Sequence, residues 1–153
     1  MISAVVLFLS AITVSNACVP TGTTTTTTPC CTMLSSNVLP RRPPSLTTQQ
    51  QCSVLQRVSS TCPIDGIVVC DAAQETNPTA ILVQFFNDAG VVASRTTTGS
   101  PATSLSVRVV CVNGVWRAAT ATGGTTTVPI ASVSCSQSGS TGTDRGYVIG
   151  TAI

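Results

Sequence analysis

Eight cysteines are the residues of this chain with the most chemical potential: Cys18, Cys30, Cys31, Cys52, Cys62, Cys70, Cys111 and Cys135. Their number is even, no C-x-x-C pair occurs, and seven residues separate Cys62 from Cys70. This spacing is a poor match to zinc-binding cysteine pairs. In an oxidising compartment the eight thiols are expected to pair as four disulfides, although spacing alone does not choose among the many possible connectivities.

The chain contains no His and no Lys. The lack of His excludes Ser-His-Asp and Cys-His catalysis and every imidazole metal site, and the lack of Lys excludes Schiff-base chemistry and a P-loop. A hydrolase would have to use a carboxylate pair, and the candidates are Asp65, Asp71, Glu75 and Asp88. Each lies beside an expected turn or strand end, where acidic side chains are ordinarily solvated. We therefore expect no catalytic residues, no metal and no cofactor.

The overall composition limits the class of partner. The chain has 153 residues, the length of a single domain, and only 8% of them are charged. A formal net charge of +2 is too small to indicate binding to nucleic acid or to an anionic membrane surface.

Residues 1–17 are predicted to be a signal peptide. A mostly apolar run from Val5 to Val14 precedes Ser15-Asn16-Ala17, which places small residues where a signal peptidase reads. The run is too short to span a bilayer. Cleavage after Ala17 would leave a secreted, extracellular chain that begins at Cys18 and keeps all eight cysteines.

Low-complexity and Pro-rich segments follow the predicted cleavage site. Residues 18–29 are expected to be a Thr-rich spacer, either an O-glycosylated stalk or a plain flexible segment. Leu39 to Pro44 is expected to be a solvated linker, and Ser45 to Ser60 is the one plausible helix. A Ser/Gly/Thr tail over residues 136–153 is expected to be flexible. The candidate O-glycosylation sites are Thr23, Thr24, Thr25, Thr26, Thr27 and Thr28.

From Cys62 onward the pattern predicts strands. Short runs rich in β-branched residues are separated by turn residues, and Asp65-Gly66 is expected to form a turn or bulge. The fold class predicted is all-β: a small disulfide-rich, β-sandwich-like domain over residues 30–135, with its core at about 52–135. The expected strands are Ile64 to Cys70, Ala80 to Phe86, Val91 to Ser94, Ser104 to Val112, Val115 to Thr120 and Thr125 to Cys135.

Asn113-Gly114 is the strongest hairpin signal, because a type I′ turn needs positive φ at both central residues. A two-residue turn sets Val112 opposite Val115 and Cys111 opposite Trp116. Trp116 would then lie in the core against a disulfide, and the alternative role is a ligand-stacking platform. Side-chain alternation places Leu105, Val107, Val109, Cys111, Trp116 and Ala118 on one face, and Arg108, Val110, Arg117 and Ala119 on the other.

Several segments in this order resemble the nematode extracellular six-cysteine, or C-six, domain family: TTTTTTPCCT, CPIDGIVVC, AILVQFFNDAG, CVNGVWRAAT and PIASVSC. The resemblance covers roughly residues 30 to 135 and implies a secreted, disulfide-bonded domain without an assigned biochemical activity. It draws the six domain cysteines from the seven between Cys30 and Cys135, so one of Cys30 and Cys31 would pair outside the six, with Cys18 as candidate partner. More faintly, Cys111, Asn113-Gly114-x-Trp116 and Cys135 resemble the end of a complement-control (Sushi) module.

Three functional classes remain after these exclusions. The first is a non-enzymatic extracellular module with a structural, adhesive or ligand-binding role, whose partner would be an extracellular protein or glycan. The second is a secreted effector or inhibitor-like domain that acts on a protein target through an exposed loop, either Gln74 to Thr79 or Arg95 to Pro101. The third is an enzyme that uses two of the carboxylates in a cleft.

Overall fold

Eight β-strands make up the regular structure of the computed structural model, which describes residues 29–51 and 54–141. The described residues contain no helix, so the all-β, disulfide-rich fold class is confirmed. The strands are β1 (Val54–Val58), β2 (Asp65–Asp71), β3 (Ala80–Asn87), β4 (Gly90–Thr98), β5 (Ser104–Val112), β6 (Val115–Ala119), β7 (Thr127–Pro129) and β8 (Ser132–Ser138).

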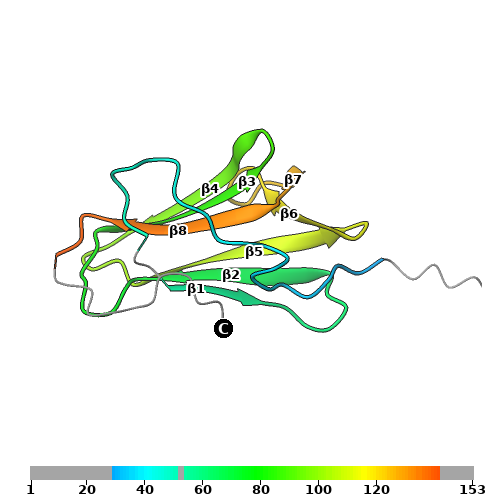
Figure 1. The fold of residues 1–153 in the computed structure, drawn as a ribbon, viewed down its shortest axis with the longest axis horizontal. Coiled ribbons are helices and arrows are strands. Elements are labelled where there is room, and N and C mark those ends of the chain that lie inside the picture. The colour runs from blue at the N-terminus through cyan, green and yellow to red at the C-terminus, as the bar shows by residue number, and fades with distance from the viewer. Residues whose placement is uncertain (1–28, 52–53, 142–153) are drawn as a thin grey trace, which may run out of the picture.

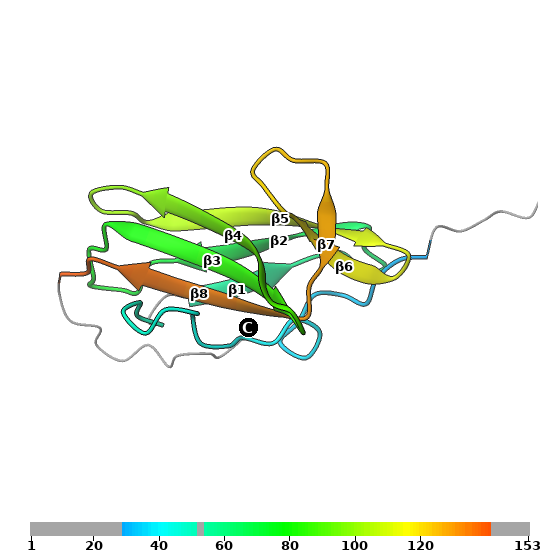
Figure 2. The same cartoon turned by 90° about the horizontal axis from the view of Figure 1, so that it is seen from above.

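The strands form two antiparallel sheets that pack face to face. One sheet has the order β1-β2-β5-β6-β7 and the other has the order β4-β3-β8. Figure 1 shows the two layers, and Figure 2 shows the three-stranded sheet from above. Alternate side chains of both sheets point inward, and fully buried Val68 and Val109 meet Phe85 and Val133 in one core cluster.

Three disulfides tie this architecture together. Cys70 of β2 and Cys135 of β8 join the two sheets, and both residues are fully buried. Two further bridges, Cys30–Cys62 and Cys31–Cys111, fasten the N-terminal segment to the loop before β2 and to β5. The segment that precedes β1 is therefore part of the domain.

The linker expected at Leu39 to Pro44 is wrong, because this segment is built into the sandwich. Leu39 is fully buried, and Arg41 forms a parallel bridge with Val133 of β8. Arg41 Nη2 donates to the carbonyls of Gln51 and Cys135. The burial of Leu39 and these backbone contacts hold the segment against the sandwich, so it is not a solvated linker.

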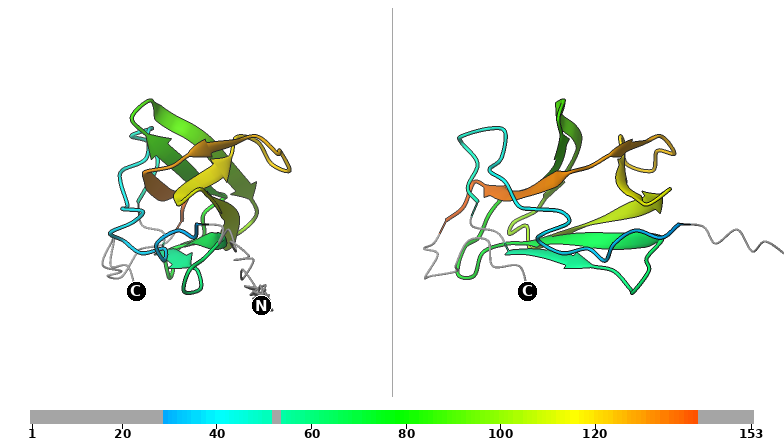
Figure 3. Two further views of the ribbon diagram at one scale, coloured as in Figure 1. Left: turned by 90° about the vertical axis from the view of Figure 1, so that its right-hand side faces the viewer. Right: turned by 45° about the vertical axis from the view of Figure 1, so that its right-hand side comes forward.

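The arginine of β1 also holds this segment. Arg57 Nε donates to Leu39 O at 2.5 Å, which links the segment to the five-stranded sheet. Burial, and then the positive charge of Arg41, lower the pKa of Arg57 below its usual value. The segment thus spans from β8 in one sheet to β1 in the other and closes this side of the sandwich (Figure 3).

The helix expected over Ser45 to Ser60 is also wrong. Gln50 forms an antiparallel bridge with Gln137, and β1 pairs with β2 over its whole length. Leu55 is the inward-facing apolar residue of that strand. The partial helical spacing is overridden because β2 offers a ladder of backbone hydrogen bonds to a stretch with two valines.

Three strand boundaries from β4 onward differ from expectation. The single strand expected over Thr125 to Cys135 is split into β7 and β8, which belong to different sheets. The chain crosses between them where Ile130 N donates to Trp116 O and Ala131 N donates to Phe86 O. Strand β8 continues to Ser138, past the boundary expected at Cys135, and β4 runs to Thr98 through part of the loop expected over Arg95 to Pro101.

The β5–β6 hairpin has the predicted register. Asn113 and Gly114 have φ angles of 52° and 77°, and Cys111 lies opposite Trp116. Trp116 is 5% exposed, and its indole N–H donates to Thr32 O at 2.9 Å. Val107 and Val109 are buried on the same face, where Leu105 packs against the core. The ring of Trp116 is therefore covered rather than free to stack on a ligand.

Asp65-Gly66, expected to form a turn or bulge, lies inside β2 instead. The glycine pairs with Val109 of β5, and a Cβ atom there would lie 3.3 Å from Trp116 Cη2 and 3.0 Å from Val58 O. The missing side chain lets the Trp116 ring lie against the strand.

We expect Trp116→Ala to lower the free energy of unfolding by about 3–5 kcal/mol, because it leaves a large cavity and removes the partner of Thr32 O. Urea unfolding followed by circular dichroism measures the loss. The matched control is Val115→Thr at the neighbouring exposed position, which should change stability by less than about 0.5 kcal/mol. Similar losses in both variants would contradict a structural role specific to Trp116.

Candidate functional site

Six of the eight cysteines are in disulfides, whereas Cys18 and Cys52 lie outside the described residues. The expectation that Cys30 or Cys31 pairs outside the domain is wrong, because both bridge to cysteines within it. Cys31 N donates to Pro63 O, which holds the adjacent cysteines near Cys62.

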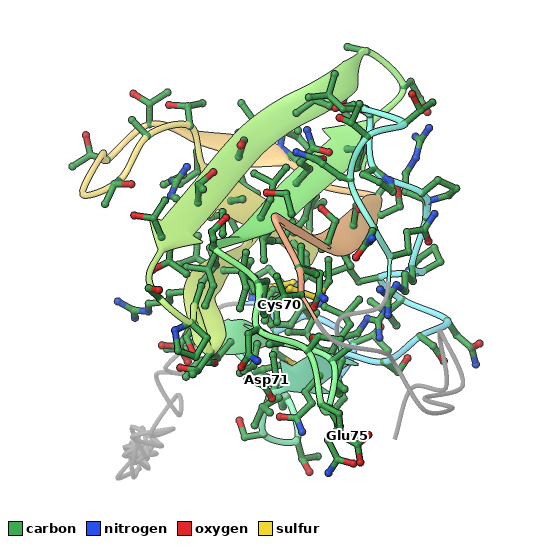
Figure 4. All side chains as sticks on the ribbon, turned by 90° about the vertical axis from the view of Figure 1, so that its left-hand side faces the viewer. Cys70, Asp71 and Glu75 are labelled. Atoms are coloured by element: carbon green, nitrogen blue, oxygen red, sulfur yellow. A yellow bond between two sulfur atoms is a disulfide. The ribbon has the colours of Figure 1, made fainter. Side chains whose placement is uncertain are left out.

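The four candidate carboxylates do not assemble into one site. Asp65 and Asp71 lie at opposite ends of β2. Asp65 forms an ion pair with Arg108, and Asp71 accepts a hydrogen bond from Ser104 Oγ. Figure 4 shows Asp71 and Glu75 toward the outside of the molecule. Asp88 is in the turn between β3 and β4. Within residues 29–51 and 54–141, no group of three or more His, Cys, Asp or Glu residues could hold a metal ion.

The first candidate binding loop, Gln74 to Thr79, is anchored to β8 by the side chain of Gln137. Gln137 of β8 is 1% exposed, and its side chain accepts from Ala73 N and donates to Thr76 Oγ1 and Ser140 Oγ. A buried amide with these partners fixes the loop to the sheet beneath it.

A groove of about 790 Å³ lies on the other side of the sandwich, between β4, β5 and the loop that joins β6 to β7. Three arginines line it, Arg95, Arg108 and Arg117, together with Thr and Ser residues and the partly exposed apolar residues Leu105 and Val110. No acidic and no aromatic residue lines it. The groove is therefore positively charged and offers many hydrogen-bonding groups.

The groove exists because β6 separates from β5. Strand β5 pairs with β2 along Ser104 to Val110, but pairs with β6 only from Val109 to Val112. Along its other edge, β6 pairs with β7 from Arg117 to Ala119. One edge of the first half of β5 is consequently left without a partner strand among the described residues.

Arg95 of β4 spans the point of separation. Its Nη2 donates to Ala119 O of β6 at 2.8 Å, and its Nη1 donates to the neighbouring carbonyl of Ser94. Ala119 O is the first β6 acceptor that would have faced β5 had the ladder continued. Arg95 satisfies this acceptor and leaves the rest of the β5 edge open.

The other two arginines differ in how firmly they are held. Arg117 donates to the carbonyl and the hydroxyl of Thr127, at 2.6 and 3.0 Å, and so fastens β7 to β6. Arg108 forms a 2.7 Å ion pair with Asp65, and its side chain is 71% exposed. An exposed ion pair of this kind contributes little to stability, so Arg108 can exchange its partner.

Side-chain alternation predicts that Arg108 and Arg117 share one face of the hairpin, but it does not predict a groove beside them. Arg95 begins the stretch expected to be an exposed loop, Arg95 to Pro101, and the early end of the β5–β6 ladder has no local sequence signal. The run of turn residues between Thr120 and Thr126 was the available hint, since it lengthens the excursion between β6 and β7.

Comparison of the chain with protein-family models, with curated proteins and with solved structures finds no match. Among the described residues, no helix has the length and apolar character needed to cross a membrane. The function is therefore inferred from the residues themselves and their geometry.

All eight cysteines are expected to be oxidised, with Cys18 and Cys52 joined to each other because the other six are already paired. Alkylation of the denatured, unreduced protein should label no thiol. Peptide mapping by mass spectrometry, with cleavage before Asp65 to separate Cys62 from Cys70, should link Cys70 to Cys135, the adjacent Cys30 and Cys31 to Cys62 and Cys111, and Cys18 to Cys52.

Because Cys30 and Cys31 are adjacent, a Cys31→Ser/Cys111→Ser variant isolates the Cys30 bridge. Cys30 should remain linked to Cys62 in that variant. A labelled thiol in the unmodified protein, or a link from Cys30 to Cys18, would contradict this pairing.

Proposed function

We propose that this protein is a secreted, non-enzymatic extracellular module that binds a macromolecular ligand on a rigid, disulfide-linked β-sandwich. The observation that carries the proposal is the Cys70–Cys135 bridge, which joins the two sheets inside the core. Such a bridge must form during folding, and disulfides persist in oxidising compartments. The apolar run and small residues of the predicted signal peptide at 1–17 support the same location.

A binding role is supported over catalysis by the groups that the molecule presents. The chain has no His or Lys, and the described groove carries arginine and hydroxyl groups but no carboxylate. A hydrolase needs a general acid and a base or nucleophile close together, whereas the four described carboxylates are spread over the two ends of β2, the loop that follows it and the β3–β4 turn. Arginine and hydroxyl groups on a rigid scaffold instead favour recognition of an anionic or polar ligand.

The effector or inhibitor alternative needs an exposed loop that reaches a target. Gln74 to Thr79 is tied to Gln137, and much of Arg95 to Pro101 belongs to β4. The groove is better supported as the interacting surface than either loop. The C-six resemblance remains a proposal that is compatible with such a module.

Expression of the full chain in eukaryotic cells tests the location. The protein should accumulate in the medium, with an intact mass that lacks residues 1–17 once any O-linked sugar is removed. A Cys70→Ser/Cys135→Ser variant keeps the signal peptide but loses the link between the sheets, worth about 4 kcal/mol by loop-closure entropy, and should be retained in the cells.

Accumulation of the unmodified chain in the cytosol with residues 1–17 still attached would overturn the proposal. For the binding role, the secreted protein should bind intact cells or extracellular matrix saturably, and reduction of its disulfides should abolish that binding.

A further inference from the structure

We propose that the groove binds an extended acidic peptide segment of an extracellular partner, which adds as a strand to the unpaired edge of β5. This inference rests on the extracellular location proposed above. It assigns the groove a class of ligand and a mode of binding.

The unpaired edge follows from the hydrogen-bond alternation of β5. Ala72 N donates to Thr103 O and Cys111 N donates to Ile64 O, so the odd-numbered residues of β5 direct their backbone groups to β2. The even-numbered residues direct theirs to the opposite side, where Val110 and Val112 meet β6.

Ser106 and Arg108 are even-numbered residues before the start of the β6 ladder. Their N–H and C=O groups point toward the groove, and in the described part of the chain no strand pairs with them. A free edge with this spacing accepts a peptide in the same way that it would accept another strand. From Ser104 to Arg108 the edge spans about 13 Å, at about 3.3 Å per residue.

Charge selects an acidic strand. Arg95 and Arg117 donate to neutral carbonyl and hydroxyl oxygens, so their positive charges have no acidic partner in the described residues of the groove. Of the three arginines, only Arg108 has an acidic partner among the described residues, and that partner is Asp65 in an exposed ion pair. Carboxylates on alternate ligand residues could approach the guanidinium groups and replace Asp65 on Arg108.

The groove favours a peptide over a glycan for two reasons. Backbone donors and acceptors at strand spacing match a polypeptide and have no counterpart in a sugar chain. The groove also lacks an aromatic platform, and its partly exposed apolar residues Leu105 and Val110 suit the alternate side chains of an added strand.

The test uses the secreted full chain and three fluorescein-labelled peptides in anisotropy titrations. The first has the alternating sequence TEVEVET, the second replaces each Glu by Gln, and the third carries an N-methyl group on every backbone amide of the first, so that neither edge of the strand can donate. The acidic peptide should bind, with affinity that falls as salt rises. The neutral and N-methylated peptides should each bind at least about tenfold more weakly, because one lacks the charge-assisted bonds and the other cannot pair with the edge.

Two exposed positions give variants with opposite expected effects. Arg108→Gln should weaken binding of the acidic peptide at least about fivefold, whereas Asp65→Asn should strengthen it by releasing Arg108. The matched control is Arg42→Gln, which removes one positive charge from an exposed arginine over Phe86, outside the groove. It should change the affinity less than about twofold.

Several results would overturn the proposal. One is equal binding of the N-methylated peptide, which would show charge attraction without strand addition. Another is an equal effect of Arg42→Gln and Arg108→Gln. A third is no peptide binding, with or without binding of a labelled heparin oligosaccharide in the same assay. In each case, a secreted and fully oxidised protein that still binds cells or matrix would leave the proposed function standing.

Discussion

The Cys70–Cys135 bridge is the constraint that holds the two layers of this molecule together. It joins β2 to β8 where both residues are fully buried. The sheets enclose few aromatic side chains, since Phe85, Phe86 and Trp116 are the aromatic residues of the described part. A core of valine, alanine and isoleucine buries less apolar area per residue, so a covalent link worth about 4 kcal/mol is a large share of the stability of such a domain.

The two sides of the sandwich are closed in different ways. On the side of β8, the N-terminal segment bridges the layers, bonding to Val133 in one sheet and receiving the side chain of Arg57 from the other. On the side of β4, closure depends on β6 and β7, because β6 diverges from β5 before their ladder covers the whole length of β5. The crossing at Ile130 and Ala131 carries the chain to β8 and leaves the first half of β5 open. The groove is thus a consequence of the path by which the chain changes sheets.

Local signals predicted part of this structure and could not predict the rest. The type I′ turn at Asn113-Gly114 set the register of the hairpin and therefore the inward position of Trp116, because strand alternation leaves no freedom once the turn is fixed. The prediction of a solvated linker at Leu39 to Pro44 is wrong because this segment is ordered by contacts with β8, more than ninety residues later in the chain. The groove depends on where a ladder ends and on Arg95 reaching β6, and both are long-range features.

The arginines show how one residue type can both hold the scaffold and leave it charged. Arg95 and Arg117 bond to carbonyl oxygens across β4, β6 and β7, so their side chains are fixed while their charges stay uncompensated by an acid in the groove. A fixed guanidinium loses little conformational entropy when a carboxylate arrives, which is the advantage of preorganisation. Arg108, held only by an exposed ion pair, supplies the exchangeable contact. The hydrogen bonds of Arg95 and Arg117 that link β4, β6 and β7 therefore also hold the two guanidinium groups in place for an anionic strand.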